Sequence, residues 1–157
     1  MTERSVTHST FVIEQTYEAS PERVFAAWAD PDIKSEWFRG PDEDDSRTHE
    51  LDFRVGGVER SAGGPKGGPV YAFEARYQDI VPNGRIVWTY EMYLGDVRIS
   101  VSLATVELRP VGGATRLRFT EQGAFLDGYD DPAQRELGTR ELLDALGAAL
   151  ERLRAGA

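Results

Sequence analysis

Glu121 is the residue of this chain whose type and position come closest to acid–base chemistry. Leu117, Phe119 and Glu121 recur at every second position, so a strand over residues 114–125 would point all three to one face. A carboxyl group on an apolar face has a raised pKa and can act as a general acid or base. The alternative is that Glu121 pairs with an arginine or lies at the rim of the sheet. The catalytic residues are therefore unknown from sequence alone, with Glu121 as the one candidate.

Three further polar residues could bind a ligand rather than react with it. Tyr77 and Tyr90 are expected to stand opposite each other on neighbouring strands, where their hydroxyls could reach a bound carbonyl group. Gln15 is expected on the inner face of the first strand, where its amide could orient a ligand or satisfy a backbone group. The chain has no cysteine and no serine in a nucleophile elbow, which argues against a hydrolase that forms a covalent intermediate.

Metal and cofactor chemistry has no support in the sequence. His8 and His49 are the two histidines, and no third ligand accompanies them at a zinc-site spacing. The acidic run 42–45 lacks the alternating ligands and the central glycine of a calcium loop. We therefore predict neither a metal ion nor a cofactor, and we interpret the acidic run as a solvated loop.

Two tight turns predict the sheet that would carry these residues. Asn83-Gly84 and Gly95-Asp96 are typical of two-residue hairpin loops. Pairing outward from them predicts these inward neighbours: Tyr77 with Tyr90, Ala75 with Met92, Ile99 with Met92, Val101 with Tyr90, and Leu103 with Trp88. This face is apolar and rich in aromatic rings, so another element or a ligand must cover it.

A third turn, at Gly112-Gly113, reverses the pattern of faces. It sets Leu108 opposite Leu117, so even-numbered residues at the end of the strand near 97–109 face inward. The turn at Gly95-Asp96 instead places odd-numbered residues at the start of the same strand inward. A bulge near Ala104-Thr105 would reconcile the two patterns.

Residues 131–154 predict the helix that covers the apolar face. Asp131 is suited to cap it, and Pro132 to occupy its first turn. Four leucines at helical spacing would pack on the sheet: Leu143, Leu146, Leu150 and Leu153. Ser20-Pro21 and Asp30-Pro31 each resemble a cap followed by a first-turn proline, which predicts two short helices after the first strand.

The complete pattern is that of an α+β protein. We expect seven strands, near residues 9–18, 48–55, 57–62, 69–81, 85–94, 97–109 and 114–125. With 157 residues and 40% hydrophobic content, we interpret residues 1–157 as one domain around one core.

A family resemblance extends over nearly the whole chain and is carried by five separate stretches: ASPERVFAAWADPDIKSEWF, VGG, YAFEARYQDIVPNGRIVWTY, GGATRLRFTEQGAFLDG and LLDALGAALERL. They resemble the Hsp90-ATPase-activator-like family of the START-like, helix-grip superfamily. The resemblance implies a curved seven-stranded antiparallel sheet wrapped around the C-terminal helix, two short helices after the first strand, and a cavity between sheet and helix. The motifs consist of tryptophans, glycines and turns, so they specify the fold rather than a chemistry.

Large side chains on the inner face would line the cavity that this resemblance implies. A site for a small molecule is typically an apolar pocket with a few converging polar groups. The expected ligand-binding residues are Trp37, Phe38, Phe73, Tyr77, Trp88, Tyr90, Met92 and Phe119. For each of them, the alternative is that it fills the core.

Three kinds of function stay open, and we favour binding of a hydrophobic or aromatic small molecule in the cavity. The second is a cyclase- or hydratase-like enzyme that uses the same cavity. The third, implied by the family resemblance, is regulation of an Hsp90-type chaperone ATPase.

Charge and the start of the chain restrict the partners. The formal net charge of -9 argues against nucleic acid and anionic membranes, because both need a basic face. The start MTERSVTHST lacks the apolar run of a signal peptide or membrane span, so we expect a cytoplasmic protein. The sequence leaves a homodimer open.

Overall fold

The computed structural model describes residues 3–39 and 47–155, so the acidic run 42–45 lies outside the described residues. One antiparallel sheet has the strand order β1-β7-β6-β5-β4-β3-β2. Its strands are β1 (Val6–Tyr17), β2 (Thr48–Leu51), β3 (Val58–Gly63), β4 (Tyr71–Val81), β5 (Arg85–Leu94), β6 (Val97–Val111) and β7 (Ala114–Leu126). The helices are α1 (Pro21–Ala29), α2 (Pro31–Trp37) and α3 (Pro132–Ala155).

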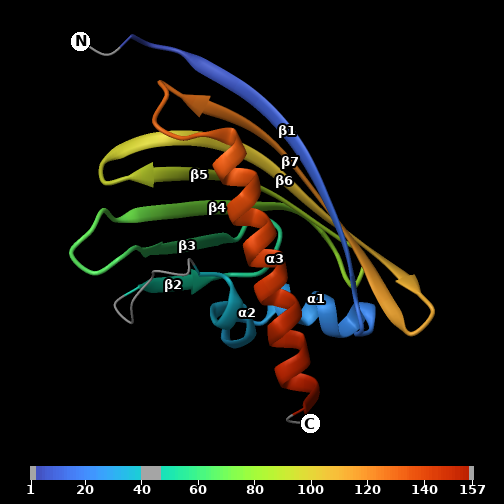
Figure 1. Cartoon of the computed structure of the whole chain (residues 1–157). Helices are drawn as coiled ribbons and strands as arrows, with labels where there is room; N and C mark the ends of the chain where they lie inside the picture. The colour runs from blue at the N-terminus through green and yellow to red at the C-terminus, as the bar shows by residue number, and fades with distance from the viewer. Residues whose placement is uncertain (1–2, 40–46, 156–157) are drawn as a thin grey trace.

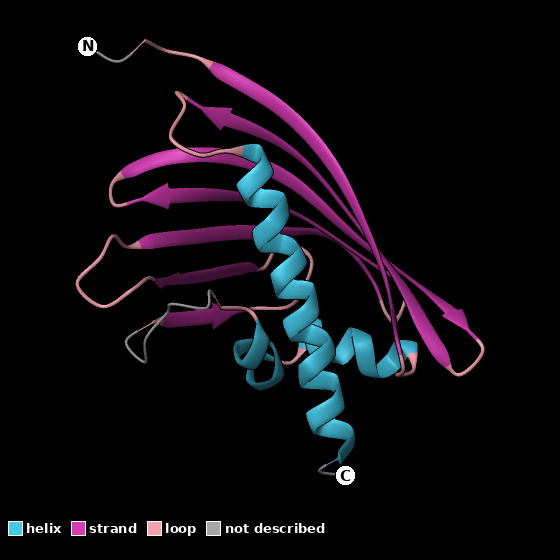
Figure 2. Cartoon of the chain, viewed as in Figure 1, coloured by secondary structure: helices cyan, strands magenta, loops and turns pink. Residues whose placement is uncertain are grey.

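The sheet is strongly curved, and α3 runs across one of its faces (Figure 1). Figure 2 shows that α3 is one uninterrupted helix and that both short helices lie beside its C-terminal half. The predicted α+β class, the seven antiparallel strands, the two short helices after the first strand and the long C-terminal helix are confirmed. β1 begins at Val6, so His8 lies on an exposed part of a strand.

The short helices begin where the sequence predicts. Ser20 Oγ accepts a hydrogen bond from Arg23 N at 3.3 Å, and Asp30 Oδ1 accepts one from Asp32 N at 2.9 Å. A proline follows each cap, where its fixed φ suits the first helical turn and its missing N–H leaves no donor unpaired. The two helix starts therefore fix where the tryptophans of α1 and α2 enter the core.

The long helix also begins as predicted, but its apolar stripe is shorter. Asp131 Oδ1 accepts a hydrogen bond from Ala133 N at 2.9 Å, which caps α3. Leu143, Leu146 and Leu150 are buried, whereas Leu153 is 38% exposed. The stripe therefore ends one turn earlier than the sequence pattern indicates, because α3 extends past the edge of the other elements at its C-terminal end (Figure 1).

The hairpin between β4 and β5 has a different register from the predicted one. Val81 pairs with Arg85, so the loop holds three residues rather than two, and Asn83 adopts a left-handed φ of 65° in it. A bulge between Tyr77 and Asp79 shifts the register once more.

These two shifts change partners without changing faces. Tyr77 lies opposite Trp88 and Ala75 lies opposite Tyr90, so the predicted pairs Tyr77 with Tyr90 and Ala75 with Met92 are wrong. Together the shifts amount to two residues, which is the period of a strand, and each side chain therefore keeps its predicted side.

A bulge in β6 exists, but not near Ala104-Thr105. Tyr93 pairs with Arg98 and Met92 pairs with Ser100, so Ile99 is the extra residue. Ile99 and Ser100 are both buried, and the even-numbered residues that follow point inward. The prediction of the bulge is confirmed, but its predicted position is wrong.

The position of this bulge overturns the predicted orientation of Val101 and Leu103. Both point to the outer face of the sheet, with exposures of 39% and 37%. The alternation of the segment ISVSL suggests apolar residues inside and serines outside, yet Ser100 and Ser102 are the buried residues. The Ser100 hydroxyl has a buried partner, because Arg135 Nη2 donates to Ser100 Oγ at 2.8 Å.

Candidate functional site

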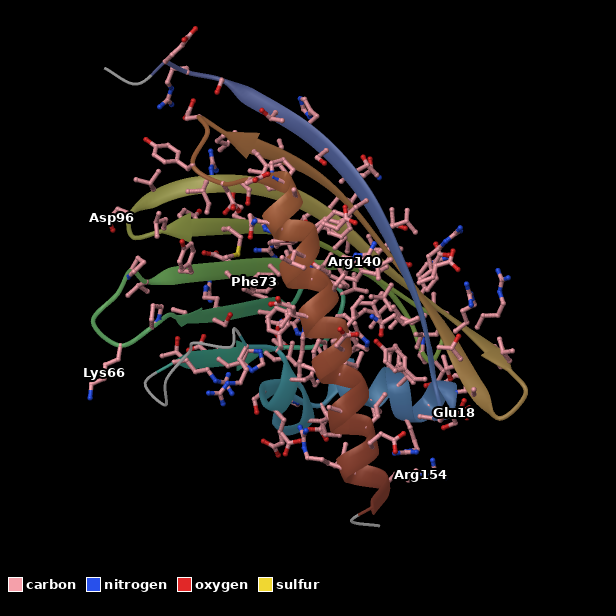
Figure 3. All side chains as sticks on the ribbon, viewed as in Figure 1. Glu18, Lys66, Phe73, Asp96, Arg140 and Arg154 are labelled. Carbon is pink, nitrogen blue, oxygen red and sulfur yellow. The ribbon has the colours of Figure 1, made fainter. Side chains whose placement is uncertain are left out.

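A pocket of about 740 Å³ lies between the concave face of the sheet, α2 and α3. Most of its wall is aromatic or aliphatic, contributed by every strand from β4 to β7 and by all three helices. The exposed residues of its rim include Glu36 on α2 and Gln134 and Glu141 on α3. In Figure 3, Phe73 lies between the sheet and α3, whereas Lys66 and Asp96 lie on hairpin loops away from it.

The wall brings together seven of the eight residues that the sequence indicates for ligand contact: Trp37, Phe38, Phe73, Trp88, Tyr90, Met92 and Phe119. Their rings contact one another, as in the 4.9 Å separation between the ring centres of Phe73 and Tyr90. Tyr77 is the exception. It is buried one layer behind the wall, where its ring packs 4.9 Å from that of Phe53.

One end of the pocket carries a polar group built from three residues. Tyr90 OH donates to Glu121 Oε1 at 2.8 Å, and Arg135 Nη1 donates to Tyr90 OH at 2.9 Å. Glu121 lies on β7 with its side chain toward α3, as the alternation with Leu117 and Phe119 predicts. The group therefore joins β5, β7 and α3 at the wall of the pocket.

Arg135 contacts further groups as well. Its Nη2 lies 2.6 Å from Asp130 Oδ2 and 2.8 Å from Ser100 Oγ, and its guanidinium lies 5.6 Å from the centre of the Tyr90 ring. Arg135 is not among the residues predicted from the sequence. Its position near the N-terminus of a helix was a signal for it, because a cation there opposes the helix dipole and must be stabilised by other groups.

Glu121 combines burial with an incomplete set of partners. Its side chain is 2% exposed, and its Oε2 has no hydrogen-bond partner among the described residues. The nearest cationic atom to that oxygen is Arg135 Nη1, at 3.6 Å. Burial raises the pKa of Glu121, and the charge of Arg135 and the hydrogen bond from Tyr90 oppose this shift. Its carboxyl can therefore exchange a proton or accept a hydrogen bond.

A second orphan polar atom belongs to the same pocket. Trp28 lines it, and Trp28 Nε1 is buried with no hydrogen-bond partner among the residues that the structure describes. By contrast, Trp37 Nε1 donates to Ala27 O at 3.0 Å. The two tryptophans pack edge to face, with ring centres 4.7 Å apart.

A buried ionic cluster, which was not predicted from the sequence, lies behind the aromatic wall. Lys34 Nζ lies 2.6 Å from Glu59 Oε1, and Tyr77 OH donates to the same oxygen at 2.6 Å. His49 Nε2 lies 2.7 Å from Glu59 Oε2. The Lys34 ammonium also lies 4.5 Å from the centre of the Phe38 ring, so a residue of the pocket wall covers the cluster.

The partners in this cluster hold Glu59 ionised. Burial alone would raise its pKa, but the charge of Lys34 and the hydrogen bonds from His49, Lys34 and Tyr77 lower the pKa of Glu59 to about 2. Burial lowers the pKa of Lys34, and Glu59 opposes that shift. Burial raises the pKa of Tyr77, so its hydroxyl stays protonated and acts as a donor.

The other residues named from the sequence lie away from the pocket. Gln15 Nε2 donates to Asp144 Oδ1 at 3.1 Å and so links β1 to α3. His8 is exposed on β1, far in the sheet order from His49 on β2. Within residues 3–39 and 47–155, no three His, Asp or Glu side chains form a group that could hold a metal ion. No helix in these same ranges is both long and apolar enough to cross a membrane.

A curved antiparallel sheet wrapped around a C-terminal helix, with two short helices after the first strand, defines the START-like, helix-grip class of proteins. The chain belongs to the family described as Activator of Hsp90 ATPase homolog 1-like protein, whose model matches residues 18–151.

Solved structures of bacterial proteins share this fold over nearly the whole chain. A protein from Rhizobium leguminosarum is 47% identical, with 96% of this chain and 99% of that chain covered and a TM-score of 0.91. The Mll3558 protein from Rhizobium loti is 51% identical, with 92% and 99% covered and a TM-score of 0.85. The protein CV1439 from Chromobacterium violaceum is 27% identical, with 90% and 96% covered and a TM-score of 0.77. No curated protein matches the chain.

Proposed function

We propose that this protein binds a small, largely apolar molecule in the pocket between the sheet and α3. The observation that carries the proposal is the pocket of about 740 Å³ with its aromatic wall. This volume falls within the range of roughly 300 to 1,000 Å³ that is usual for sites of small molecules. Water in such a pocket finds few hydrogen-bond partners, so its displacement by an apolar ligand is favourable.

Two features of the wall support binding over a solid core. The aromatic residues Phe73, Trp88 and Phe119 come from three different strands and all border the pocket. The rim residues Glu36 and Glu141 are exposed, which provides a route for a ligand between α2 and α3. The polar group at Glu121 gives the site a means to orient what it binds.

Gly138 offers a direct test. It lines the pocket from α3, and a Cβ atom added there would have no heavy atom within 4 Å. Gly138→Trp should fill the pocket, whereas Gly138→Ala should leave it open, and both remove a helical glycine that costs roughly 1 kcal/mol relative to alanine.

The measurement is a fluorescence titration with the uncharged probe N-phenyl-1-naphthylamine, alongside native mass spectrometry of freshly purified parent protein. We expect the parent and Gly138→Ala to bind the probe alike, and Gly138→Trp to bind it at least tenfold more weakly while melting no lower than the parent. Equal binding by all three proteins would contradict the proposal.

A second candidate is an enzyme of the cyclase or hydratase kind, and the free oxygen of Glu121 favours it. An acid or base at the wall of an apolar pocket can move a proton on a folded substrate. For such an enzyme, Glu121→Gln should keep ligand binding and abolish turnover of any substrate found. Unchanged turnover in that variant would show that Glu121 is not the acid or base, and no turnover by the parent protein would count against this candidate.

A further inference from the structure

We infer that the molecule held in this pocket carries a hydroxyl or amino group that donates a hydrogen bond to Glu121 Oε2. This inference rests on the proposed function, since it names the chemical class of the ligand for the same site. It also means that a carboxylic acid of the same skeleton is a poor ligand.

The unpaired oxygen is the first observation. Glu121 is 2% exposed, and its two oxygens differ, since Oε1 accepts from Tyr90 OH at 2.8 Å while Oε2 has no hydrogen-bond partner among the described residues. A buried carboxylate oxygen without a partner is unfavourable, and buried polar atoms in folded proteins are almost always paired. A bound ligand is the group that can complete it, because Glu121 lines the pocket.

The surrounding hydrogen bonds decide what the ligand must offer. Arg135 Nη1 donates to the Tyr90 oxygen, so the Tyr90 proton is directed to Glu121 Oε1. The second terminal nitrogen of the guanidinium group, Nη2, donates to Asp130 and Ser100. Among the described residues that line the pocket, Glu121 Oε2 is the buried oxygen without a hydrogen-bond partner, and its lone pair is completed by a donor.

The charges at the pocket point the same way. Its described lining residues include four carboxylates and two guanidinium groups: Glu36, Glu121, Asp130, Glu141, Arg39 and Arg135. Arg135 already has carboxylates at 2.6 Å and 3.6 Å. Because carboxylates outnumber guanidinium groups and Arg135 is already paired, an anionic ligand would meet net repulsion near Glu121.

The side chains next to Glu121 determine where the apolar part of the ligand lies. Phe119 and Glu121 point to the same face of β7, about 7 Å apart along the strand. Beyond Phe119 lie Trp28 and Trp88, with ring centres 6.4 Å and 5.9 Å from that of Phe119. A ring system anchored by its donor at Glu121 would extend over Phe119 toward the tryptophans.

The test uses three probes with one skeleton: 2-naphthol, 2-methylnaphthalene and 2-naphthoate, titrated into the parent protein by calorimetry at neutral pH. We expect 2-naphthol to bind roughly tenfold or more tightly than 2-methylnaphthalene, as a hydrogen bond to a charged group provides. We expect 2-naphthoate to bind more weakly than either. Glu121→Gln should shrink both differences, because the charge is lost while the shape is nearly kept.

Glu141→Gln is the matched control, since it removes one rim carboxylate from the same pocket without touching the buried oxygen. It should leave the order of the three probes unchanged. If Glu141→Gln shrinks the differences as much as Glu121→Gln, the general charge of the pocket sets the order and the inference is overturned.

The titrations of the parent protein alone also test the inference, whether or not the variants fold. Equal affinity for all three probes, or tightest binding of 2-naphthoate, overturns the inference and leaves the proposed function standing. If none of the three probes binds, the proposed function falls together with the inference.

Discussion

Lys34 Nζ lies 2.6 Å from Glu59 Oε1, and the two side chains are 2% and 1% exposed. Lys34 belongs to α2 and Glu59 to β3, so this ion pair attaches the helix that carries Trp37 to the sheet. A buried ion pair tolerates its desolvation only when both partners and their remaining hydrogen bonds are in place. Tyr77 and His49 complete these bonds. We therefore interpret the cluster as the anchor of α2 at the end of the pocket.

Removing one partner of this pair should destabilise the protein strongly. Lys34→Met leaves Glu59 buried without its cation, and we expect a loss of about 3 to 5 kcal/mol in the free energy of unfolding. The double variant Lys34→Met/Glu59→Gln should recover much of that loss, because the uncompensated charge is gone. Urea denaturation measures both. A double variant as unstable as the single one would contradict this account.

The same cluster should make stability depend on pH in acid. The folded-state pKa of Glu59 is about 2, below its ordinary value of 4.5, so its ionised form favours the folded protein. This contribution is complete above pH 4.5 and is lost as the pH falls toward 2. We expect the parent to lose more stability between pH 5 and pH 2 than the double variant. Parallel curves would show that Glu59 does not contribute.

The packing of α3 on the sheet can be tested at one leucine. Leu146 is 0% exposed, so Leu146→Asp would bury an unpaired charge and should cost about 3 to 5 kcal/mol. Leu153→Asp is the matched control, because Leu153 is 38% exposed on the same helix, and it should change stability by roughly 0.5 kcal/mol or less. Thermal melting compares the two. Equal melting of Leu146→Asp and the parent would refute the packing.

Glu121 should titrate above its ordinary value. Burial raises its pKa from 4.5, and carbon NMR of labelled glutamate carboxyls can follow it, with Glu121→Gln to assign the signal. Because the folded pKa is the higher one, its contribution to stability is complete at low pH and is lost as the pH rises through the folded pKa. A midpoint at or below 4.5 would remove the basis for acid–base chemistry at this residue.

Sequence patterns predict the elements of this fold well because each has a local signal. The caps at Ser20, Asp30 and Asp131 mark helix starts, and alternation marks the strands. Partners across strands are harder, because one bulged residue changes every pairing beyond it. Tyr77 kept its face because two shifts compensated, whereas Val101 changed its face because a single shift did not.

In the candidate site, too, features with a local sequence signal were predictable and contacts between distant residues were not. The aromatic wall could be predicted, since Trp88, Tyr90 and Phe119 belong to strands with clear faces. Its polar partners could not, because Arg135 meets Tyr90 across 45 residues and Lys34 meets Glu59 across 25. Nothing local in the sequence pairs a cation on a helix with a carboxylate on a distant strand.

The bulge at Ile99 decides which side chains of β6 face the interior of the sheet. Deleting Ile99 would leave Ser100 directly after Arg98 and still opposite Met92, so Ser100 and Ser102 would keep their inward places and Val101 and Leu103 would stay on the outer face. Regular pairing of β6 with Ile99 kept and set opposite Met92 would instead turn Val101 and Leu103 inward, where two bulky hydrocarbon side chains would replace two small hydroxyls and Arg135 would lose the acceptor at Ser100. The bulge therefore keeps small hydroxyl groups beside Arg135, and the interior at this place depends on one irregularity in strand pairing as well as on the composition of β6.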